Sequence, residues 1–330
     1  MIRECCKALP DIHYRIIQVI EIWRAYRMGK MRIIKNGRKN KYVGLLYISP
    51  WILGFLMFQA YPFISSFIYS FTDFDMLQKP DFIGIKNYID MFTNDGNFMM
   101  SLKATFTYVI VAVPSKLIFA LIIALILNIR LRFINLYRTI YYLPSILGGS
   151  VAISILWRFL FMKEGTVNSI TSLVHIKPVD WLGSPKIAIY TIGLLAVWQF
   201  GSSMVIFLAG LKQIPHEIYE AGRIDGASHI RSFFSITIPF LTPIILFNLV
   251  MQTVNAFQEF TAAFVVTNGG PVNSTYLYAM KLYQEGFLFY KMGYASALSW
   301  FLFVIIMIFT LVIFKSSKAW VFYVDGGDEK

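Results

Sequence analysis

Long apolar stretches separated by short polar connectors form the dominant pattern along this chain. A transmembrane helix needs about 20 consecutive, mostly apolar residues. Six stretches meet this requirement, at about 43–70, 101–127, 139–161, 187–210, 241–266 and 292–314. Some contain proline, as at Pro50, Pro62 and Pro114, which neighbouring helices can accommodate within a bundle. The pattern predicts an all-α, polytopic membrane protein with six transmembrane helices.

Composition supports this fold class and narrows the function. Hydrophobic residues make up 57% of the 330 and charged residues only 15%, with a mean hydropathy of +0.60. Soluble domains contain roughly 45 to 50% apolar residues. No G-x-x-x-x-G-K-[S/T] phosphate loop occurs. We therefore expect a transport subunit that is not an enzyme, with no catalytic residues, no cofactor and no metal site.

The positive charge is concentrated before the first apolar stretch. Of the net charge of +12, residues 1–41 supply +8, from eleven Lys or Arg and three acids. The positive-inside rule places this segment in the cytoplasm. The acidic connector 72–100 then lies outside and the basic connector 128–138 inside. Six spans would leave both termini and the 211–240 loop in the cytoplasm. The charge is thus explained by topology and by anionic membrane lipid, and we expect no nucleic-acid partner.

The segment 1–41 leaves two interpretations open. Apolar residues at helical spacing within 12–23 would let this stretch lie along the membrane surface. Alternatively, Met28 or Met31 is the start, and the preceding residues are dispensable. Cys5 and Cys6 are adjacent, too close for an ordinary disulfide and too few for a metal site, so they receive no function.

The connector 211–240 has an ordered polar pattern that a plain membrane loop would not need. Pro215 occupies a natural first-turn position for a short helix that begins at His216, and Gly226 ends it. Glu217, Glu220 and Arg223 carry charge at spacings of three along this helix. A second helical piece is expected from 228 to 236, before the fifth span.

The letters of this connector resemble the EAA loop of permease subunits in binding-protein-dependent ABC importers. That loop has the pattern E-A-A, two variable residues, D-G-A, and a distal I-x-L-P. The matching residues here are Glu220-Ala221-Gly222, Asp225-Gly226-Ala227 and Ile236-Thr237-Ile238-Pro239. Two positions depart from the pattern, Gly222 for alanine and Ile238 for leucine. Glycine costs about 1 kcal/mol of helix propensity relative to alanine.

The resemblance implies a type I ABC importer permease fold in residues 42–330. It also implies a second permease as heterodimer partner, two ATP-binding subunits and an extracytoplasmic sugar-binding protein. In that family the EAA helix seats in a cleft of the ATPase. The implied ATPase-coupling residues here are Glu217, Glu220, Ala221, Gly222, Asp225, Gly226 and Ala227. The alternative is a cytoplasmic loop held only by its own salt bridges.

Two further segments resemble the carbohydrate branch of these permeases. Thr267-Asn268-Gly269-Gly270-Pro271 is similar to its T-x-G-G-P segment, and residues 82–88 are similar to its F-x-G-x-x-N-Y segment. This implies sugar import, and we expect an oligosaccharide derived from plant or algal polysaccharide. Two alternatives stay open: a permease for another polar solute such as glycerol phosphate, and an ion-coupled secondary transporter built from inverted repeats.

Polar residues in the fifth span indicate where a substrate could bind. Asn248, Gln252, Asn255 and Glu259 follow one another at steps of four, three and four, which places them on one helix face. Amides and carboxylates suit sugar hydroxyls, although bonding between packed helices is the alternative. By resemblance, the same cavity is faced by residues of the fourth span, of which the first could stack on a sugar ring: Trp198, Gln199 and Ser202.

One more pair of charges lies within the spans. At 1.5 Å rise per residue, Lys116 is about 17 Å and Glu259 about 27 Å from the cytoplasmic ends of their spans. The offset of about 10 Å argues against a direct salt bridge. We expect Glu259 near the outer mouth and Lys116 bonded to a backbone carbonyl or to water in the cavity.

Overall fold

The computed structural model of the chain describes residues 43–129 and 132–323. The basic segment 1–41, with its two cysteines and its expected surface helix, lies outside the described residues. Contacts divide the chain into two units, residues 1–64 and 65–330. In the first unit, α3 (Val43–Phe55) leads through a π-helical turn, η1 (Leu56–Ala60), into α4 (Tyr61–Tyr69), which continues into the second unit. Together they form one candidate membrane span, Tyr47–Tyr69.

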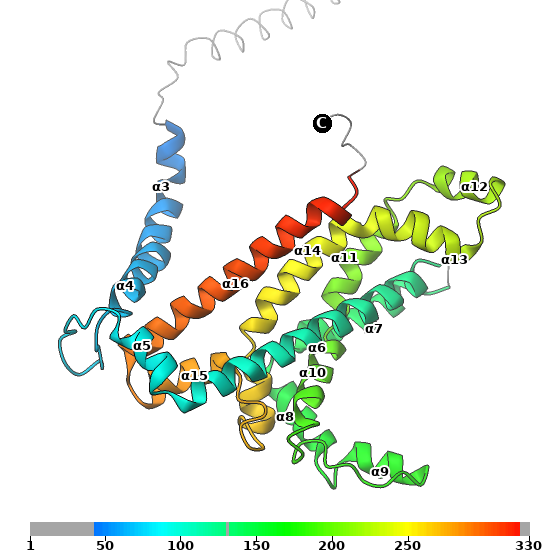
Figure 1. The fold of residues 1–330 in the computed structure, drawn as a ribbon. Helices are drawn as coiled ribbons and strands as arrows, with labels where there is room; N and C mark the ends of the chain where they lie inside the picture. Colours follow the sequence, from blue (N-terminus) through cyan, green and yellow to red (C-terminus); the bar gives the residue numbers. More distant parts are fainter. Residues whose placement is uncertain (1–42, 130–131, 324–330) are drawn as a thin grey trace, which may run out of the picture. The chain divides into compact units, whose positions relative to one another are not determined.

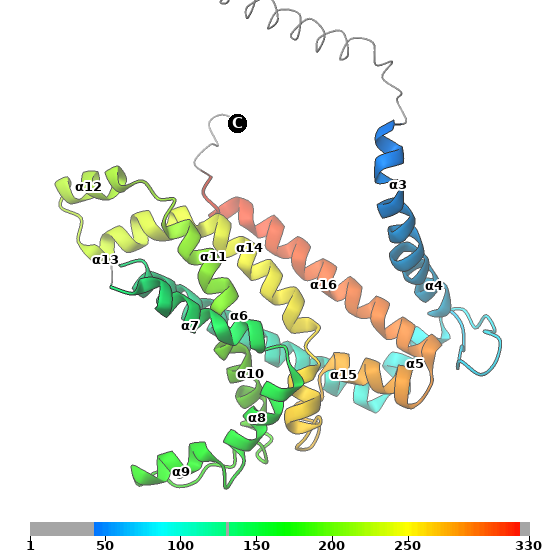
Figure 2. The same ribbon diagram turned by 180° about the vertical axis from the view of Figure 1, so that it is seen from behind.

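The second unit consists of helices, shown from two sides in Figures 1 and 2. They are α5 (Lys86–Thr93), α6 (Gly96–Leu127), α7 (Ile134–Leu147), α8 (Val151–Phe161), α9 (Thr166–Leu173), α10 (Ala188–Trp198), α11 (Gly201–Leu211), α12 (His216–Ile224), α13 (His229–Ser232), α14 (Ile238–Phe257), α15 (Tyr278–Tyr283) and α16 (Met292–Trp320). Three π-helical turns accompany them: η2 (Phe233–Thr237), η3 (Ala263–Thr267) and η4 (Gln284–Leu288).

The membrane spans agree with the predicted fold class. Four helices are long and apolar enough to cross a membrane, and the number rises to six if each of two bent pairs counts as one span. The bent pairs are α7 with α8 and α9, at 99°, and α10 with α11, at 48°. Within 43–129 and 132–323 the extended pairing is limited to one isolated bridge, Thr72 with Phe82. The prediction of an all-α membrane protein is confirmed.

Helix α6 forms the centre of the second unit. It packs against α10, α11, α14 and α15, and its buried side chains continue along much of its length. The Asp95 carboxylate caps its start by accepting the backbone N–H groups of Asn97 and Phe98 at 3.0 and 3.1 Å. A helix packed on several sides needs apolar residues all round, which explains why α6 has no single polar face.

A buried cation fastens α15 to the start of α6. The amino group of Lys281, only 1% exposed, lies 2.5 Å from the Asp95 carboxylate and 3.1 Å from that of Glu285. The Tyr294 hydroxyl of α16 also donates to Asp95 at 2.5 Å. Burial raises the pKa of Asp95, but the hydrogen bonds from Lys281 and Tyr294 outweigh it and hold that pKa below its usual value.

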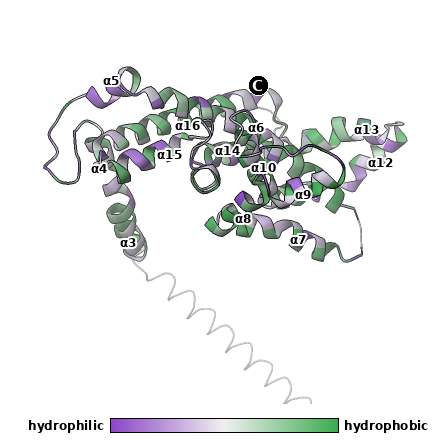
Figure 3. Cartoon of the chain, turned by 90° about the horizontal axis from the view of Figure 1, so that it is seen from below, coloured by the Kyte–Doolittle hydropathy of each residue, from purple (hydrophilic) through white to green (hydrophobic). Residues whose placement is uncertain are grey.

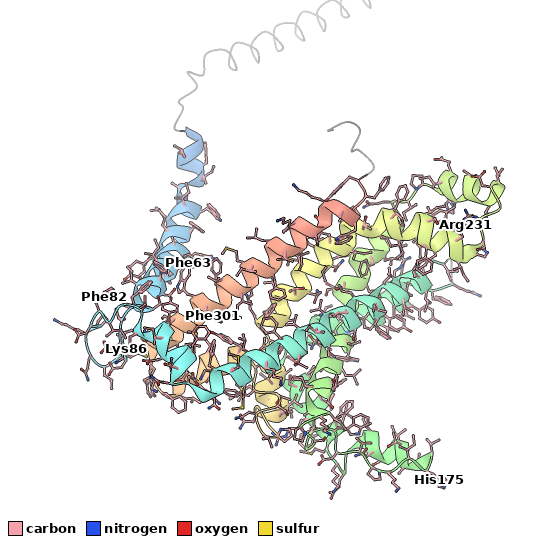
Figure 4. The ribbon with its side chains drawn as sticks, in the orientation of Figure 1. Phe63, Phe82, Lys86, His175, Arg231 and Phe301 are labelled. Carbon is pink, nitrogen blue, oxygen red and sulfur yellow. The ribbon has the colours of Figure 1, made fainter. Side chains whose placement is uncertain are left out.

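An aromatic cluster lies beside this ion pair and joins α5, α6 and α16. Phe301, labelled in Figure 4, packs edge-on against Phe92 and Phe98, with ring centroids 5.5 and 5.4 Å apart. Such edge-to-face pairs add stability beyond the area they bury. The ion pair and the rings together fix this end of α6.

The two bent spans meet at their bends. The Ser145 hydroxyl of α7 donates to the Gln199 carbonyl at 3.0 Å and accepts the Ser202 backbone N–H at 2.9 Å. The side-chain amide of Gln199 donates to the Gly148 carbonyl at 2.7 Å. Neither Gly148 nor Gly201 has room for a Cβ atom against the neighbouring helix. These bonds satisfy backbone groups that the breaks would otherwise leave unpaired in an apolar region.

The fifth span differs from the prediction of one helix over 241–266. The helix begins earlier, because α13 and η2 run on into α14, and α14 ends at Phe257. A short break follows before η3. Glu259 lies in this break, and its carboxylate accepts the Ala262 backbone N–H at 2.9 Å. The bond satisfies a backbone N–H in the first turn of the helical segment that begins at Thr261. Glu259 therefore lies outside α14 and is not on a continuous helix face with Asn248.

Candidate coupling loop and substrate cavity

The predicted coupling loop forms a helical hairpin of α12 and α13. Helix α12 begins directly after Pro215, at the expected position. At its end Gly226 has φ of 77°, its N–H donates to Arg223 O at 3.0 Å, and the Ala227 N–H donates to Gly222 O at 2.9 Å. This pair of bonds around a left-handed glycine is a Schellman motif. The DGA letters of the sequence therefore encode the turn between the two helices.

The hairpin is fastened to the start of α14. The Tyr219 hydroxyl lies 2.9 Å from the Thr237 hydroxyl in η2. A Cβ atom placed on Gly222 would lie 3.1 Å from Cδ1 of Ile236. Gly222 thus lets the α12 backbone approach Ile236 closely, which gives a packing reason for the departure from alanine. Through these contacts with η2, a displacement of α12 would also move the beginning of α14.

The hairpin region exposes both carboxylates and apolar side chains. Glu217, Glu220 and Asp225 are exposed, as are Ala221 and Gly226, whereas Gly222 and Ala227 are partly buried. Large apolar side chains of the hairpin and of η2 are also exposed, namely Ile224 at 87%, Ile230 at 73% and Phe234 at 65%. Figure 3 shows the hydrophilic stretch on α12, and Figure 4 labels the exposed Arg231 on α13.

The three carboxylates of the hairpin have no ionic partner close by. In the part of the chain that the structure describes, no Lys, Arg or His side chain lies within 4.0 Å of Glu217, Glu220 or Asp225. The alternative of a loop held by its own salt bridges is therefore not favoured. The hairpin presents unpaired negative charge and apolar surface together, a combination suited to a protein partner.

A groove separates the hairpin from the ends of α6 and α11. Its volume is about 900 Å³. Its walls include Leu125 of α6 and the following Asn128, Leu211 of α11, and Arg223 and His229 of the hairpin. The hairpin thus lies at the Leu127 end of α6. The buried ion pair at Asp95 lies at the opposite end of that helix.

A cavity of about 220 Å³ lies between α6, α10 and α14. It brings together four residues that the sequence singled out: Gln199, Gln252, Asn255 and Glu259. The amides of Gln252 and Asn255 make no hydrogen bond to another described residue. They are available to a ligand, whereas one N–H of the Gln199 amide is already bonded to Gly148.

The other three predicted cavity residues do not line this space. Asn248 is 1% exposed and its amide donates to the Ile244 carbonyl at 3.1 Å, one turn back in α14. Trp198 packs on Trp157, with ring centroids 6.1 Å apart. Ser202 meets Ser145 at the α10–α11 bend through its backbone N–H. Any role of these three in substrate binding stays a prediction.

Two side chains of α6 complete the cavity, Tyr108 and Lys116. With Ala112 they follow one face of α6 at steps of four, a periodicity that could have identified them. From their depths in the membrane we expected no direct salt bridge between Lys116 and Glu259, and among the described residues no ion pair within 4.0 Å joins them. Both side chains nevertheless border the same space.

Comparison with known proteins identifies the family of the chain. The family model for "Binding-protein-dependent transport system inner membrane component" matches residues 101–325. The probable ABC transporter permease protein YesP of Bacillus subtilis (strain 168) is 48% identical over 296 residues, covering 89% of this chain and 96% of that protein. The arabinooligosaccharides transport system permease protein AraP of the same organism is 32% identical, covering 82% of this chain and 87% of that protein.

A solved structure agrees with the fold. The crystal structure of a bacterial ABC transporter involved in the import of the acidic polysaccharide alginate contains a chain that matches with a TM-score of 0.73. That match has 21% identity and covers 87% of this chain and 98% of that one. The family match contradicts the alternative of an ion-coupled secondary transporter. The chain belongs to the inner-membrane permease components of binding-protein-dependent transport systems and has the fold of an ABC importer permease.

Proposed function

We propose that this chain is the permease subunit of an ATP-driven importer that carries a sugar, specifically an oligosaccharide, across the cytoplasmic membrane. The observation that carries the proposal is a pair of amides, Gln252 and Asn255, which make no hydrogen bond to another described residue and open on a cavity between three membrane helices. Amides both donate and accept hydrogen bonds, as sugar hydroxyls do. The arabinooligosaccharide transport named for one relative supports the same class of substrate.

The cavity requires a partner to enclose such a ligand. Its volume of about 220 Å³ is below the roughly 300 to 1,000 Å³ of typical small-molecule sites. A second, similar permease facing it would enlarge the site and complete the translocation path. Heterodimer formation with that second permease is part of the proposal.

The hairpin of α12 and α13 is the proposed docking site for the ATP-binding subunits, two copies of which would serve the pair of permeases. Its exposed carboxylates, apolar side chains and Schellman turn support this role. The proposal places this hairpin and both termini in the cytoplasm, and the Asp95 end of α6 toward an extracytoplasmic sugar-binding protein. Closure of the ATP-binding subunits in the cytoplasm and docking of the binding protein outside would together favour the outward-facing state of the permease. The chain would then contribute the free-energy difference between its outward- and inward-facing states.

Replacing both amides tests the proposed sugar site. The variant Gln252→Leu with Asn255→Leu, assembled with its partner subunits in proteoliposomes, should lose most oligosaccharide uptake, because leucine cannot bond to hydroxyl groups. Met251→Leu, on the exposed side of α14, is the control and should transport normally. Co-purification of the partner subunits monitors assembly. Undiminished uptake of every sugar by an assembled double variant would remove these amides from the site.

A further inference from the structure

Lys116 has a position in the cavity that the neutral amides do not explain. It lies near the middle of α6, where a charged side chain is costly to place in a membrane and marks a functional site by default. Its amino group makes no hydrogen bond or ion pair with another described residue. By contrast, the buried Lys281 has two carboxylates within 3.1 Å. Lys116 is therefore a cation with room for an external partner.

Glu259 is the acid that shares the cavity, and it does not complete an ion pair with Lys116. One of its oxygens is already held by the Ala262 backbone N–H at 2.9 Å. Its charge is partly compensated within the chain by this bond. The amino group of Lys116 has no hydrogen bond to another described residue, and its attraction to Glu259 acts over more than the 4.0 Å of an ion pair. The polar groups around Lys116 are otherwise the uncharged side chains of Tyr108, Gln199, Gln252 and Asn255.

This combination defines a class of ligand. A lysine ammonium forms strong charge-assisted hydrogen bonds with a carboxylate, while the adjacent amides suit hydroxyl groups. A ring that carries one carboxylate and several hydroxyls matches both. Resting on the proposed function, we infer that Lys116 binds a carboxylate of the transported sugar and that the substrate is an acidic, uronic-acid-containing oligosaccharide.

The cavity residues from α14 and the break after it favour a neutral ligand by themselves, because Gln252 and Asn255 are uncharged and Glu259 is acidic. The packing of α6 against α14 changes this balance by adding a cation to the same space. The specificity of the cavity is thus assembled from two helices.

Paired substrates test the assignment. The complete transporter is reconstituted, and uptake and stimulated ATP turnover are measured with trigalacturonate and with a neutral arabinotriose. Lys116→Met should raise the KM for trigalacturonate about tenfold or more, as expected for loss of a charged hydrogen bond, and should change the KM for arabinotriose much less. Lys116→Arg should retain most trigalacturonate uptake. Lys103→Met, an exposed lysine on the same helix, is the control and should behave as the unmodified chain.

Other outcomes would overturn the inference and show what fails. If the unmodified transporter carries arabinotriose but no acidic sugar, the acidic specificity is wrong and the proposed function stands. If it carries neither kind of sugar, both fail. If Lys116→Met depresses both substrates equally, and the added change Glu259→Gln restores them, Lys116 serves only to balance Glu259. We expect no such restoration.

Discussion

At Gly226 a single backbone angle sets the shape of the coupling loop. Its φ of 77° places it in the left-handed region, and nothing lies within 4 Å of a Cβ atom built there. A side chain would therefore meet backbone strain without a steric clash. The end of α12 at Gly226 could be predicted from the sequence, because a left-handed helix end depends on a single residue and glycine is the residue that favours it.

Gly226→Val should uncouple ATP hydrolysis from transport. A β-branched residue in this region costs at least about 1 to 2 kcal/mol, so the Schellman turn opens and α12 loses its fixed direction. We expect reduced co-purification of the ATPase and loss of substrate-stimulated ATP turnover in proteoliposomes. Gly226→Asn is the matched control, since asparagine tolerates this conformation, and should keep most of both. Equal behaviour of the two variants would show that the turn geometry does not matter.

Only some of the residues that line the cavity could be predicted from the sequence. Gln252 and Asn255 were found by helical spacing within one span, and the structure places both on the cavity. Tyr108 and Lys116 come from another helix, about 140 residues earlier in the chain. Hydropathy gives no information on which faces of two distant helices meet, so these contributors could not be predicted.

At the level of elements, the bends of two spans decide how helices meet. The stretches 139–161 and 187–210 read as ordinary apolar spans, yet each is a bent pair. Gly148 and Gly201 allow the close approach at the bends, while Ser145 and Gln199 bond to the freed backbone groups. Glycine and serine are common in straight membrane helices as well, which is why the sequence did not disclose the bends.

Two glycines of the fourth span should respond oppositely to alanine. A Cβ atom on Gly201 would lie 2.7 Å from the Tyr141 carbonyl oxygen of α7, whereas one on Gly193 meets only Val111 Cγ1, at 3.7 Å. Gly201→Ala should cost about 1 to 3 kcal/mol through overpacking and lower the melting temperature of the purified protein in detergent. Gly193→Ala should be neutral or slightly stabilising, because alanine has the higher helix propensity. Similar melting temperatures for both would contradict tight packing at the bend.

For the second unit as a whole, the buried ion pair joins segments far apart in the chain. Lys281, Asp95 and Tyr294 come from α15, the cap of α6, and α16. The sequence placed Asp95 in an acidic outer connector and assigned nothing to Lys281. Their pairing depends on the return of the chain after the fifth span, which no local pattern encodes.

Lys281→Met should destabilise this unit strongly. It leaves two carboxylates partly buried without their cation, and breaking a buried pair in this way costs about 3 to 5 kcal/mol. The pKa of Asp95, now held below its usual value of 3.8, should rise, so the stability that its ionised form contributes is lost at a higher pH during acid titration. Thermal melting across pH 3 to 7, a range set to span roughly that transition, measures both effects. Lys291→Met, an exposed lysine nearby, should change neither, and identical curves for both variants would exclude a structural role for the pair.

Features that depend on neighbouring residues could be predicted from the sequence, whereas features that depend on packing between distant segments could not. Membrane helices and the α12–α13 hairpin were predictable, since lipid requires each span to satisfy its own backbone and since proline and glycine act on adjacent residues. Rotation of each helix about its axis and the bends of the two spans depend on contacts between distant segments. The tertiary structure alone therefore places Lys116 beside the amides of α14, where three helices define one cavity.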